Sequence, residues 1–295
     1  KTSREWTMIS VTELGSFPQD KFVASIGSIY ENSPWVAERA HAAGPFDNLT
    51  DMHKAMAQVV ADASDDQKLA LLCAHPDLAG RAAAAKQLTT ESTEEQTKAG
   101  LFDNLTDEER ANLLEMNERY RARFGFPFIL AVRNATKYTI LGSIASRLSN
   151  QVSQERDECL RQVNKIAWMR LLTIASPKPT GFLTCHVLDT AKGCPASGMR
   201  IELHRMDGNN RKLLGSFITN SDGRTGPVLK GEDFQAGVYE WTFFAGDYFA
   251  TAGVPVSGQP FLDVIPLRFG IDNPEDHYHV PLLASPWSMS TYRGS

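Results

Sequence analysis

The sequence has few cysteines and no long apolar segment. Its four cysteines are Cys73, Cys159, Cys185 and Cys194, and no two of them form a CxxC pair. A chain of 295 residues is also much larger than the small secreted scaffolds that depend on disulfides. We therefore expect free thiols in a reducing compartment. Because no run of about 18 apolar residues occurs, we expect neither a membrane-spanning segment nor a membrane partner.

Clusters of positive charge are absent as well. The chain has 30 lysines and arginines against 35 aspartates and glutamates, and none of its segments is rich in Lys and Arg. Nucleic-acid-binding proteins usually carry a basic stripe or patch, so we expect no nucleic-acid partner. Apolar residues make up 42% of the chain, which is enough for ordinary hydrophobic cores. The length favours two domains.

Helix signals dominate the first part of the chain. Three segments have the pattern of a capping box, in which Ser or Thr begins a helix and Glu or Gln follows three residues later. These segments are Ser64–Gln67, Ser92–Glu95 and Thr106–Glu109. The sequence FDNLTD occurs at 46–51 and at 102–107, and we expect each copy to begin a helix with its Thr as N-cap. Apolar residues recur at spacings of three and four over 151–174, which predicts an amphipathic helix.

Strand signals follow a proline-containing linker. We predict an all-α domain over 1–175, a linker over 176–180 and a β domain over 181–295. In the β domain, turn-forming clusters separate short runs in which apolar and polar residues alternate, a pattern that predicts a β-sandwich. The alternating apolar residues are Met199, Ile201, Leu203, Tyr239, Trp241 and Phe243. Pro266 and Pro281 lie within strand-like runs, so we expect those strands at sheet edges or bulges.

The segment 277–295 holds the densest set of candidate site residues. It reads HYHVPLLASPWSMSTYRGS, so that His277 and His279 alternate along an apolar strand and Tyr-Arg-Gly-Ser follows. A chain end is normally frayed and tolerant of change. Because this tail carries several polar side chains just after a strand, we expect it to be docked and used. A further histidine, His186, lies in the middle of the strand-like segment 181–189.

Three motifs of the β domain resemble the 5-hydroxyisourate hydrolases of the transthyretin-like family. They are Thr184-x-His186-Val-Leu-Asp189, Asp222-Gly-Arg224 and the segment 277–295. The resemblance covers about residues 181–295 and implies a transthyretin-like β-sandwich. It implies catalytic roles for His186, Arg224, His279 and Ser295. It also implies substrate contacts from Tyr292, Arg293 and Gly294.

These residue types suit the opening of a cyclic amide by water. Water is a poor nucleophile, and histidine has the side chain whose ordinary pKa lies nearest neutrality, so it is the natural base. Two histidines that face one cavity lower each other's pKa, because two positive charges repel. An arginine stabilises the developing oxyanion, and a serine orients water or a neighbouring group. We expect His277 to point to the opposite face of its strand from His279 and assign it no role.

Two other functions are compatible with this set of residues. Three imidazoles, from His186, His277 and His279, could bind zinc, but the expected orientation of His277 and the lack of a carboxylate motif argue against it. A transthyretin-like domain can also carry a ligand without catalysis. Such carriers lack the histidines and the Tyr-Arg-Gly-Ser tail, so we expect a hydrolase without a metal or cofactor. Trp287-Ser288-Met289 replaces the Tyr-Gly-Tyr of many family members, which bears on substrate selectivity.

An ordered set of three motifs marks the helical domain. They are His75-Pro-Asp-Leu-Ala-Gly80, Ser92-x-x-Glu95-Gln96 and Phe124-Gly-Phe-Pro-Phe-Ile129. Over about residues 8–174 the chain resembles the decarboxylases that act on 2-oxo-4-hydroxy-4-carboxy-5-ureidoimidazoline (OHCU). The resemblance implies catalytic roles for His75 and Glu95. It implies substrate contacts from Ser92, Gln96, Phe126, Pro127, Phe128, Ile129 and Arg170, with Arg147 as a competitor of Arg170.

Local structure offers another explanation for two of these residues. Glu95 is the third residue of the capping box that Ser92 begins, and His75 precedes a proline at a helix end. The implied decarboxylation needs no cofactor, because the leaving carboxylate lies beside a C=N bond that accepts its electron pair. His75 would take the hydroxyl proton or hold the carboxylate, and Glu95 would deliver a proton to one face. The backbone of 124–129 would bind the ring.

The two resemblances fit one another, because OHCU is the product of the first reaction and the substrate of the second. We expect a bifunctional enzyme of urate degradation that acts on small molecules and yields (S)-allantoin. Resemblance also implies a homotetramer through the C-terminal domain, with dimer contacts through the N-terminal domain. Free thiols fit a peroxisomal or cytoplasmic location rather than secretion. The alternative is a β-sandwich ligand-binding module fused to a helical interaction domain.

Overall fold

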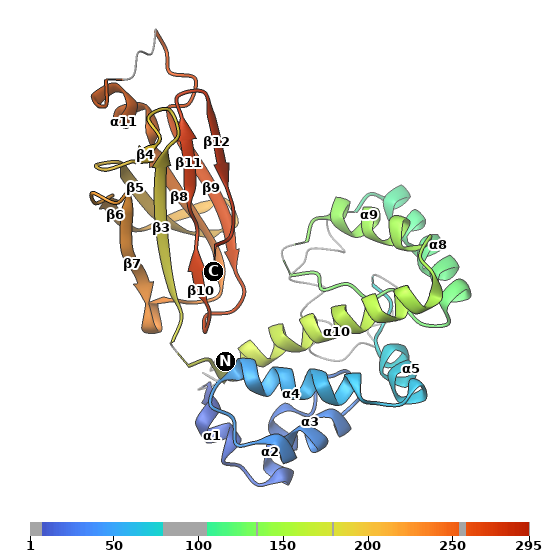
Figure 1. Ribbon diagram of the computed structural model, residues 1–295. Coiled ribbons are helices and arrows are strands. Elements are labelled where there is room, and N and C mark those ends of the chain that lie inside the picture. The colour runs from blue at the N-terminus through green and yellow to red at the C-terminus, as the bar shows by residue number, and fades with distance from the viewer. Residues whose placement is uncertain (1–7, 79–104, 134, 179, 254–257, 295) are drawn as a thin grey trace, which may run out of the picture. The chain divides into compact units, whose positions relative to one another are not determined.

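The computed structural model describes residues 8–78, 105–133, 135–178, 180–253 and 258–294 (Figure 1). The chain forms two compact units, and the division between them falls between Ser176 and Pro177. The first unit is helical and the second consists of two β-sheets, as predicted. Across the described residues, no helix is both long enough and apolar enough to cross a membrane.

The helical unit is built from helices of very different length, with a short pair of strands at its two ends. Strand β1 (Ile9–Ser10) pairs in parallel with β2 (Ala175–Ser176), which ties the start of the unit to its end. The helices are α1 (Val11–Gly15), α2 (Gln19–Ile26), α3 (Trp35–Ala40), η1 (His41–Ala43), α4 (Leu49–Ala61), α5 (Asp65–Ala74), α8 (Asp107–Phe124), α9 (Lys137–Arg147) and α10 (Val152–Ile174).

Helix caps account for most of the predicted helix starts. Capping boxes begin α5 at Ser64 and α8 at Thr106, as predicted. In the first FDNLTD copy, however, Asn48 is the N-cap, and its side-chain oxygen accepts a hydrogen bond of 2.8 Å from the Asp51 N–H. Thr50 is therefore inside α4, and its prediction as N-cap was wrong. Asn48, two residues before Thr50, already caps the free N–H groups at the start of the helix. The box predicted at Ser92 lies outside the described residues.

Helix α10 is the long central helix of this unit. Its predicted apolar face is confirmed: Val163, Ala167 and Leu171 are buried in one core cluster, and the other two predicted residues, Leu160 and Ile174, are partly buried against it. This face contacts α2, α4 and α5. Burying one such aliphatic side chain contributes about 1.5–3 kcal/mol, so the helix is held mainly by this stripe rather than by its own propensity.

The second unit is a β-sandwich. One sheet has the order β10-β3-β11-β12, with β4 and β7 also paired to β3, and the other has the order β6-β5-β8-β9. The elements are β3 (Phe182–Asp189), β4 (Cys194–Pro195), β5 (Arg200–Asp207), β6 (Asn210–Ile218), β7 (Arg224–Lys230), η2 (Gly231–Asp233), β8 (Gly237–Phe244), α11 (Ala245–Thr251), β9 (Val264–Ile271), β10 (His277–His279), β11 (Leu282–Ser285) and β12 (Ser288–Thr291).

The inner faces of both sheets form the second core. Alternate residues of β3 are buried with Ile201, Leu203, Trp241 and Phe243 of the opposite sheet, which confirms the predicted alternation. Pro266 lies on β9, an edge strand, as predicted. Pro281 lies in the short break between β10 and β11, which pair in parallel with successive parts of β3. The outer face of β3 is left free for polar side chains.

Two leucines of the helical unit provide a matched test of this packing. Leu171 is fully buried, whereas Leu69 is 42% exposed. We expect Leu171→Ala to lower the free energy of unfolding of this unit by about 2–5 kcal/mol and Leu69→Ala by less than about 1 kcal/mol. Urea unfolding followed by circular dichroism at the helical band measures both. Equal losses would contradict the assignment of α10 as the core helix.

Candidate active sites

Three neighbouring strands bring the candidate residues of the β-sandwich together. Phe182, Thr184 and His186 share one face of β3, because side chains alternate along a strand. In the ladder with β7, His186 lies opposite Arg224, and in the ladder with β10, Thr184 lies opposite His279. The ring centroids of His186 and His279 are 6.3 Å apart. Sheet register thus gathers residues from three distant parts of the chain.

Both histidines are disposed to stay neutral. Burial lowers the pKa of His186, the positive charge of Arg224 lowers it further, and a backbone hydrogen bond to Asp222 acts in the opposite direction. Burial also lowers the pKa of His279, and Arg224 and then His186 add to the effect. A neutral imidazole can accept a proton, so each side chain can serve as a general base near neutral pH.

The Nε2 atom of His186 is shielded from solvent and has no hydrogen-bond partner among the described residues. Buried polar atoms nearly always have a partner, because leaving one unpaired costs about 1–3 kcal/mol. An unpaired ring nitrogen beside Arg224 is therefore suited to a substrate or a water molecule that completes its hydrogen bonding.

The predicted orientation of His277 was wrong. Residues two apart in a strand share a face, so His277 and His279 lie on the same side of β10. The His277 ring stacks on Phe182, with centroids 4.2 Å apart. The hydroxyl of Thr184 lies 2.9 Å from His277 Nε2 and 2.9 Å from His279 Nδ1. Among the described residues, no three His, Cys, Asp or Glu side chains form a group that could hold a metal ion.

The tail that follows β12 is docked beside β10. The Gly294 N–H donates a hydrogen bond of 2.8 Å to the His279 carbonyl. A Cβ atom at Gly294 would come within 2.7 Å of the His279 ring, so only glycine fits without displacing it. The Arg293 guanidinium instead lies over the Tyr278 ring, 4.3 Å from its centroid, and 3.6 Å from an Asp276 carboxylate oxygen.

The other predicted tail residues are placed as follows. Tyr292 is 58% exposed, and Ser295 lies outside the described residues. The motif Trp287-Ser288-Met289 leads into β12, and the side chains of Trp287 and Met289 are exposed. Substrate contacts from the tail stay predictions. The Arg293 side chain contacts Tyr278 and Asp276, and not the face of β10 that carries His277 and His279.

In the helical unit, His75 ends α5 and is buried. Its Nδ1 lies 3.0 Å from the Leu71 carbonyl, which can only accept, so Nδ1 carries the proton and Nε2 of the neutral ring is an acceptor. Burial lowers the pKa of His75; the negative charge of Glu31 raises it and the positive charge of Arg170 lowers it. The site therefore combines a neutral imidazole with a buried pair of opposite charges.

Glu31 is a site neighbour that the sequence did not reveal. It lies between α2 and α3 in a stretch without a recognisable motif, and it is 2% exposed. Its carboxylate forms an ion pair of 2.9 Å with Arg170, which is 4% exposed. Arg170 also donates a hydrogen bond of 3.3 Å to the Ile29 carbonyl. Only the fold, which packs α10 against the first helices, brings these residues to His75.

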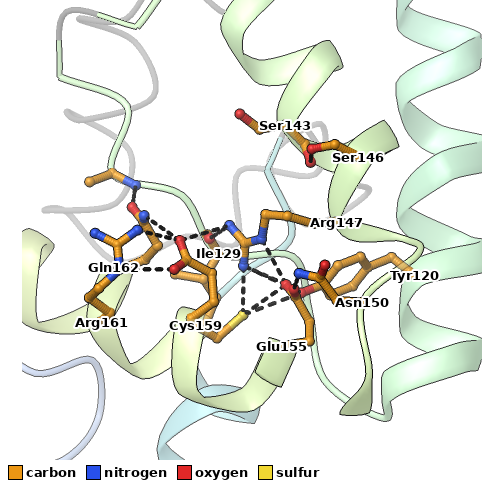
Figure 2. Close-up of polar contacts among 12 residues, drawn as sticks. Tyr120, Ile129, Ser143, Ser146, Arg147, Asn150, Glu155, Cys159, Arg161 and Gln162 are labelled. Carbon is orange, nitrogen blue, oxygen red and sulfur yellow. Dashed lines mark hydrogen bonds and ion pairs between the residues drawn. The ribbon is translucent and has the colours of Figure 1, made fainter. Parts of the chain in front are cut away.

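Arg147, the competitor of Arg170, belongs to a different network (Figure 2). Its guanidinium donates to Glu155 at 2.8 Å and to the Ile129 carbonyl at 2.9 Å, and Tyr120 also donates to Glu155. The side-chain amide of Asn150 donates a hydrogen bond of 2.6 Å to the second oxygen of the Glu155 carboxylate. The arrangement holds a buried charge with several partners and pins the backbone of the Phe-Gly-Phe-Pro-Phe-Ile loop.

The side chains of this loop are core residues. Phe126, Phe128 and Ile129 are almost fully buried and Pro127 is buried too, with the two phenyl rings packed edge-on against Tyr120. The substrate contacts expected from this loop stay predictions, and the Ile129 carbonyl already accepts a hydrogen bond from Arg147. Ser92, Glu95 and Gln96 lie outside the described residues, so their predicted roles stay predictions.

Comparison with known proteins finds a matching family for each of the two parts of the chain. Residues 15–172 match the OHCU decarboxylase family, and residues 183–294 match the HIUase/Transthyretin family. The chain is 56% identical to a 5-hydroxyisourate hydrolase of Pseudomonas aeruginosa over 120 residues, which are 40% of this chain and 95% of that protein. It is 39% identical to 2-oxo-4-hydroxy-4-carboxy-5-ureidoimidazoline decarboxylase of Halalkalicoccus jeotgali over 172 residues, 58% of this chain and 95% of that protein.

One crystal structure is similar over nearly the whole length. The crystal structure of (S)-allantoin synthase is 49% identical in sequence, has a TM-score of 0.84, and the match covers 97% of this chain and 100% of that one. The resemblances read from the motifs are therefore confirmed for both domains.

The electrostatic effect of Arg224 can be measured directly. In an NMR titration, we expect His186 and His279 to titrate below the ordinary histidine pKa and Arg224→Met to raise both midpoints, because a nearby positive charge is removed. Arg200→Met removes an exposed arginine of the other sheet and should leave both midpoints in place. Unchanged midpoints in Arg224→Met would show that the arginine does not face the two rings.

Proposed function

The chain belongs to the OHCU decarboxylase family through residues 15–172 and to the HIUase/Transthyretin family through residues 183–294, and we propose that it couples two consecutive reactions of urate breakdown. The C-terminal domain hydrolyses 5-hydroxyisourate to OHCU, and the N-terminal domain decarboxylates OHCU to (S)-allantoin. One observation carries this function: a single chain joins two domains of which one makes the other's substrate, and an (S)-allantoin synthase matches it almost end to end.

In the hydrolase site, the base is a histidine on the outer face of β3 or of its neighbour β10. His186 or His279 takes a proton from water, and the resulting hydroxide attacks the ring carbonyl of 5-hydroxyisourate. Arg224 stabilises the negative charge that develops on the carbonyl oxygen. The C–N bond then breaks, and the protonated imidazole returns the proton to the leaving nitrogen. The proposed role of Ser295 is to orient the water or a neighbouring group, and docked Gly294 supports it because it brings the tail to His279.

In the decarboxylase site, the substrate itself accepts the electrons. The C–C bond to the carboxylate breaks, CO₂ leaves, and the electron pair moves into the adjacent C=N bond. His75 Nε2 accepts the hydroxyl proton, and Arg170 binds the carboxylate before it leaves. Glu31 keeps Arg170 in place through its buried ion pair. Glu95 returns a proton to one face, while Ser92, Gln96 and the loop backbone at Phe126–Ile129 hold the ring.

We further propose a homotetramer formed through the C-terminal domains, with dimer contacts through the N-terminal domains. Strand β12 ends its sheet, so its outer edge can pair with a second copy. We also propose a peroxisomal or cytoplasmic location, which all four cysteines support because they are free.

The division of labour can be tested with one variant in each domain. We expect His75→Ala to abolish the stereoselective formation of (S)-allantoin, measured by circular dichroism, while 5-hydroxyisourate still disappears at the wild-type rate in the ultraviolet. His279→Ala should slow the disappearance of 5-hydroxyisourate by about a hundred-fold and leave the conversion of preformed OHCU unchanged. If His75→Ala slowed both reactions equally, the assignment of two separate sites would be wrong.

The two buried arginines of the helical domain form a matched pair. Each is bound to a buried carboxylate, so Arg170→Met and Arg147→Met should each cost about 3–5 kcal/mol of stability. Only Arg170→Met removes the proposed carboxylate contact. At a temperature where both variants are folded, we expect kcat/KM for OHCU to fall about a hundred-fold in Arg170→Met and no more than about ten-fold in Arg147→Met. The reverse order would assign the substrate contact to Arg147.

A further inference from the structure

The Thr184 hydroxyl connects two histidines. It lies 2.9 Å from His277 Nε2 and 2.9 Å from His279 Nδ1. Parallel pairing sets this geometry, because Thr184 lies opposite His279 while Phe182 lies opposite His277. The stack of His277 on Phe182, with ring planes 22° apart, holds the first ring in register with the hydroxyl. All three polar side chains therefore belong to one ordered row on the outer face.

A hydroxyl has one proton, so it can donate to only one of the two rings and must accept from the other. The tautomers of the two histidines are therefore coupled. If Thr184 donates to His277 Nε2, it accepts from His279 Nδ1–H, and the lone pair of His279 Nε2 is free. If Thr184 donates to His279 Nδ1 instead, His279 carries its proton on Nε2 and cannot act as a base there.

We propose that Thr184 and His277 are positioning residues that hold His279 as its Nδ1–H tautomer, so that its Nε2 accepts the proton of the attacking water. This inference rests on the proposed hydrolase function of the site. The chemistry selects this direction, because a His279 that has gained a proton must donate from both nitrogens. Thr184 must then accept, and its own proton must go to His277. Only the proposed arrangement needs no reorientation during the reaction.

We call the chain of hydrogen bonds from His279 through Thr184 to His277 the relay. Three single variants and one double variant distinguish it from a hydrogen bond of Thr184 that does not fix the tautomer of His279. Thr184→Ser keeps the hydroxyl, and Thr184→Val removes it at nearly constant shape. His277→Phe keeps an aromatic ring to stack on Phe182 but removes the acceptor, so the Thr184 hydroxyl becomes free to donate to His279 Nδ1. In the double variant Thr184→Val/His277→Phe, neither tautomer of His279 is imposed.

The relay predicts an unusual order of activities. We expect kcat for 5-hydroxyisourate hydrolysis to fall roughly a hundred-fold in His277→Phe, about ten-fold in Thr184→Val and less than about two-fold in Thr184→Ser, with little change in KM. The double variant should recover to the level of Thr184→Val. The decarboxylase activity of the same full-length chain is the control for folding, because its residues lie in the other domain.

Nitrogen NMR of the His279 ring provides a readout that does not depend on turnover. We expect the proton on Nδ1 in the wild type and in Thr184→Ser, and on Nε2 in His277→Phe. A wild-type ring protonated on Nε2, a Thr184→Val variant less active than His277→Phe, or a double variant no better than His277→Phe would overturn the relay. Loss of the proposed function would look different, since the wild-type chain would then not accelerate 5-hydroxyisourate decay at all.

Discussion

A polar side chain that leaves water must find a partner inside the protein, and both candidate sites are organised by this requirement. His75 is buried against the Leu71 carbonyl, and His279 is held between Thr184 and the docked tail. The same burial lowers the pKa of each of these histidines and keeps it neutral. In the proposed mechanism, desolvation keeps these two bases neutral, and their hydrogen-bond partners decide which ring nitrogen faces the substrate.

In the helical domain, two buried arginine–carboxylate pairs serve different purposes. The pair of Arg147 and Glu155 fixes the loop backbone at Ile129, within a network that also includes Tyr120 and Asn150 (Figure 2). The pair of Arg170 and Glu31 lies beside His75, and it holds the Arg170 guanidinium where we propose that the substrate carboxylate binds. Buried ion pairs add little net stability, so their value here is the position they impose on a loop and on a charge.

In the β domain, a single strand serves both the core and the site. The buried face of β3 carries Leu183, Cys185 and Val187, and its outer face carries Thr184 and His186. A shift of register by one residue would exchange the two faces, so the hydrophobic core that fixes the register also fixes the site. The tail adds a second constraint, because Gly294 fits against the His279 ring only without a side chain.

The sequence by itself determined the order of a helical domain and a β-sandwich, the capping boxes at Ser64 and Thr106, and the two families. These features depend on neighbouring residues, on periodicity or on motifs, all of which are local. It also allowed a wrong orientation for His277, although a period of two already requires that His277 and His279 share a face. Thr50 was misplaced because two good N-cap residues compete within one turn.

Only the tertiary structure decided which partners the buried groups find. Glu31 and Arg170 meet although 139 positions separate them along the chain, and nothing in the local sequence of Glu31 marks it. The fold likewise places Arg170, and not Arg147, close enough to His75 to lower its pKa, while Arg147 bonds the Ile129 carbonyl. Thr184 joins His277 to His279 because parallel strand pairing sets their register. Each of these contacts arises from packing between distant segments, and packing is a property of the whole fold rather than of any one segment.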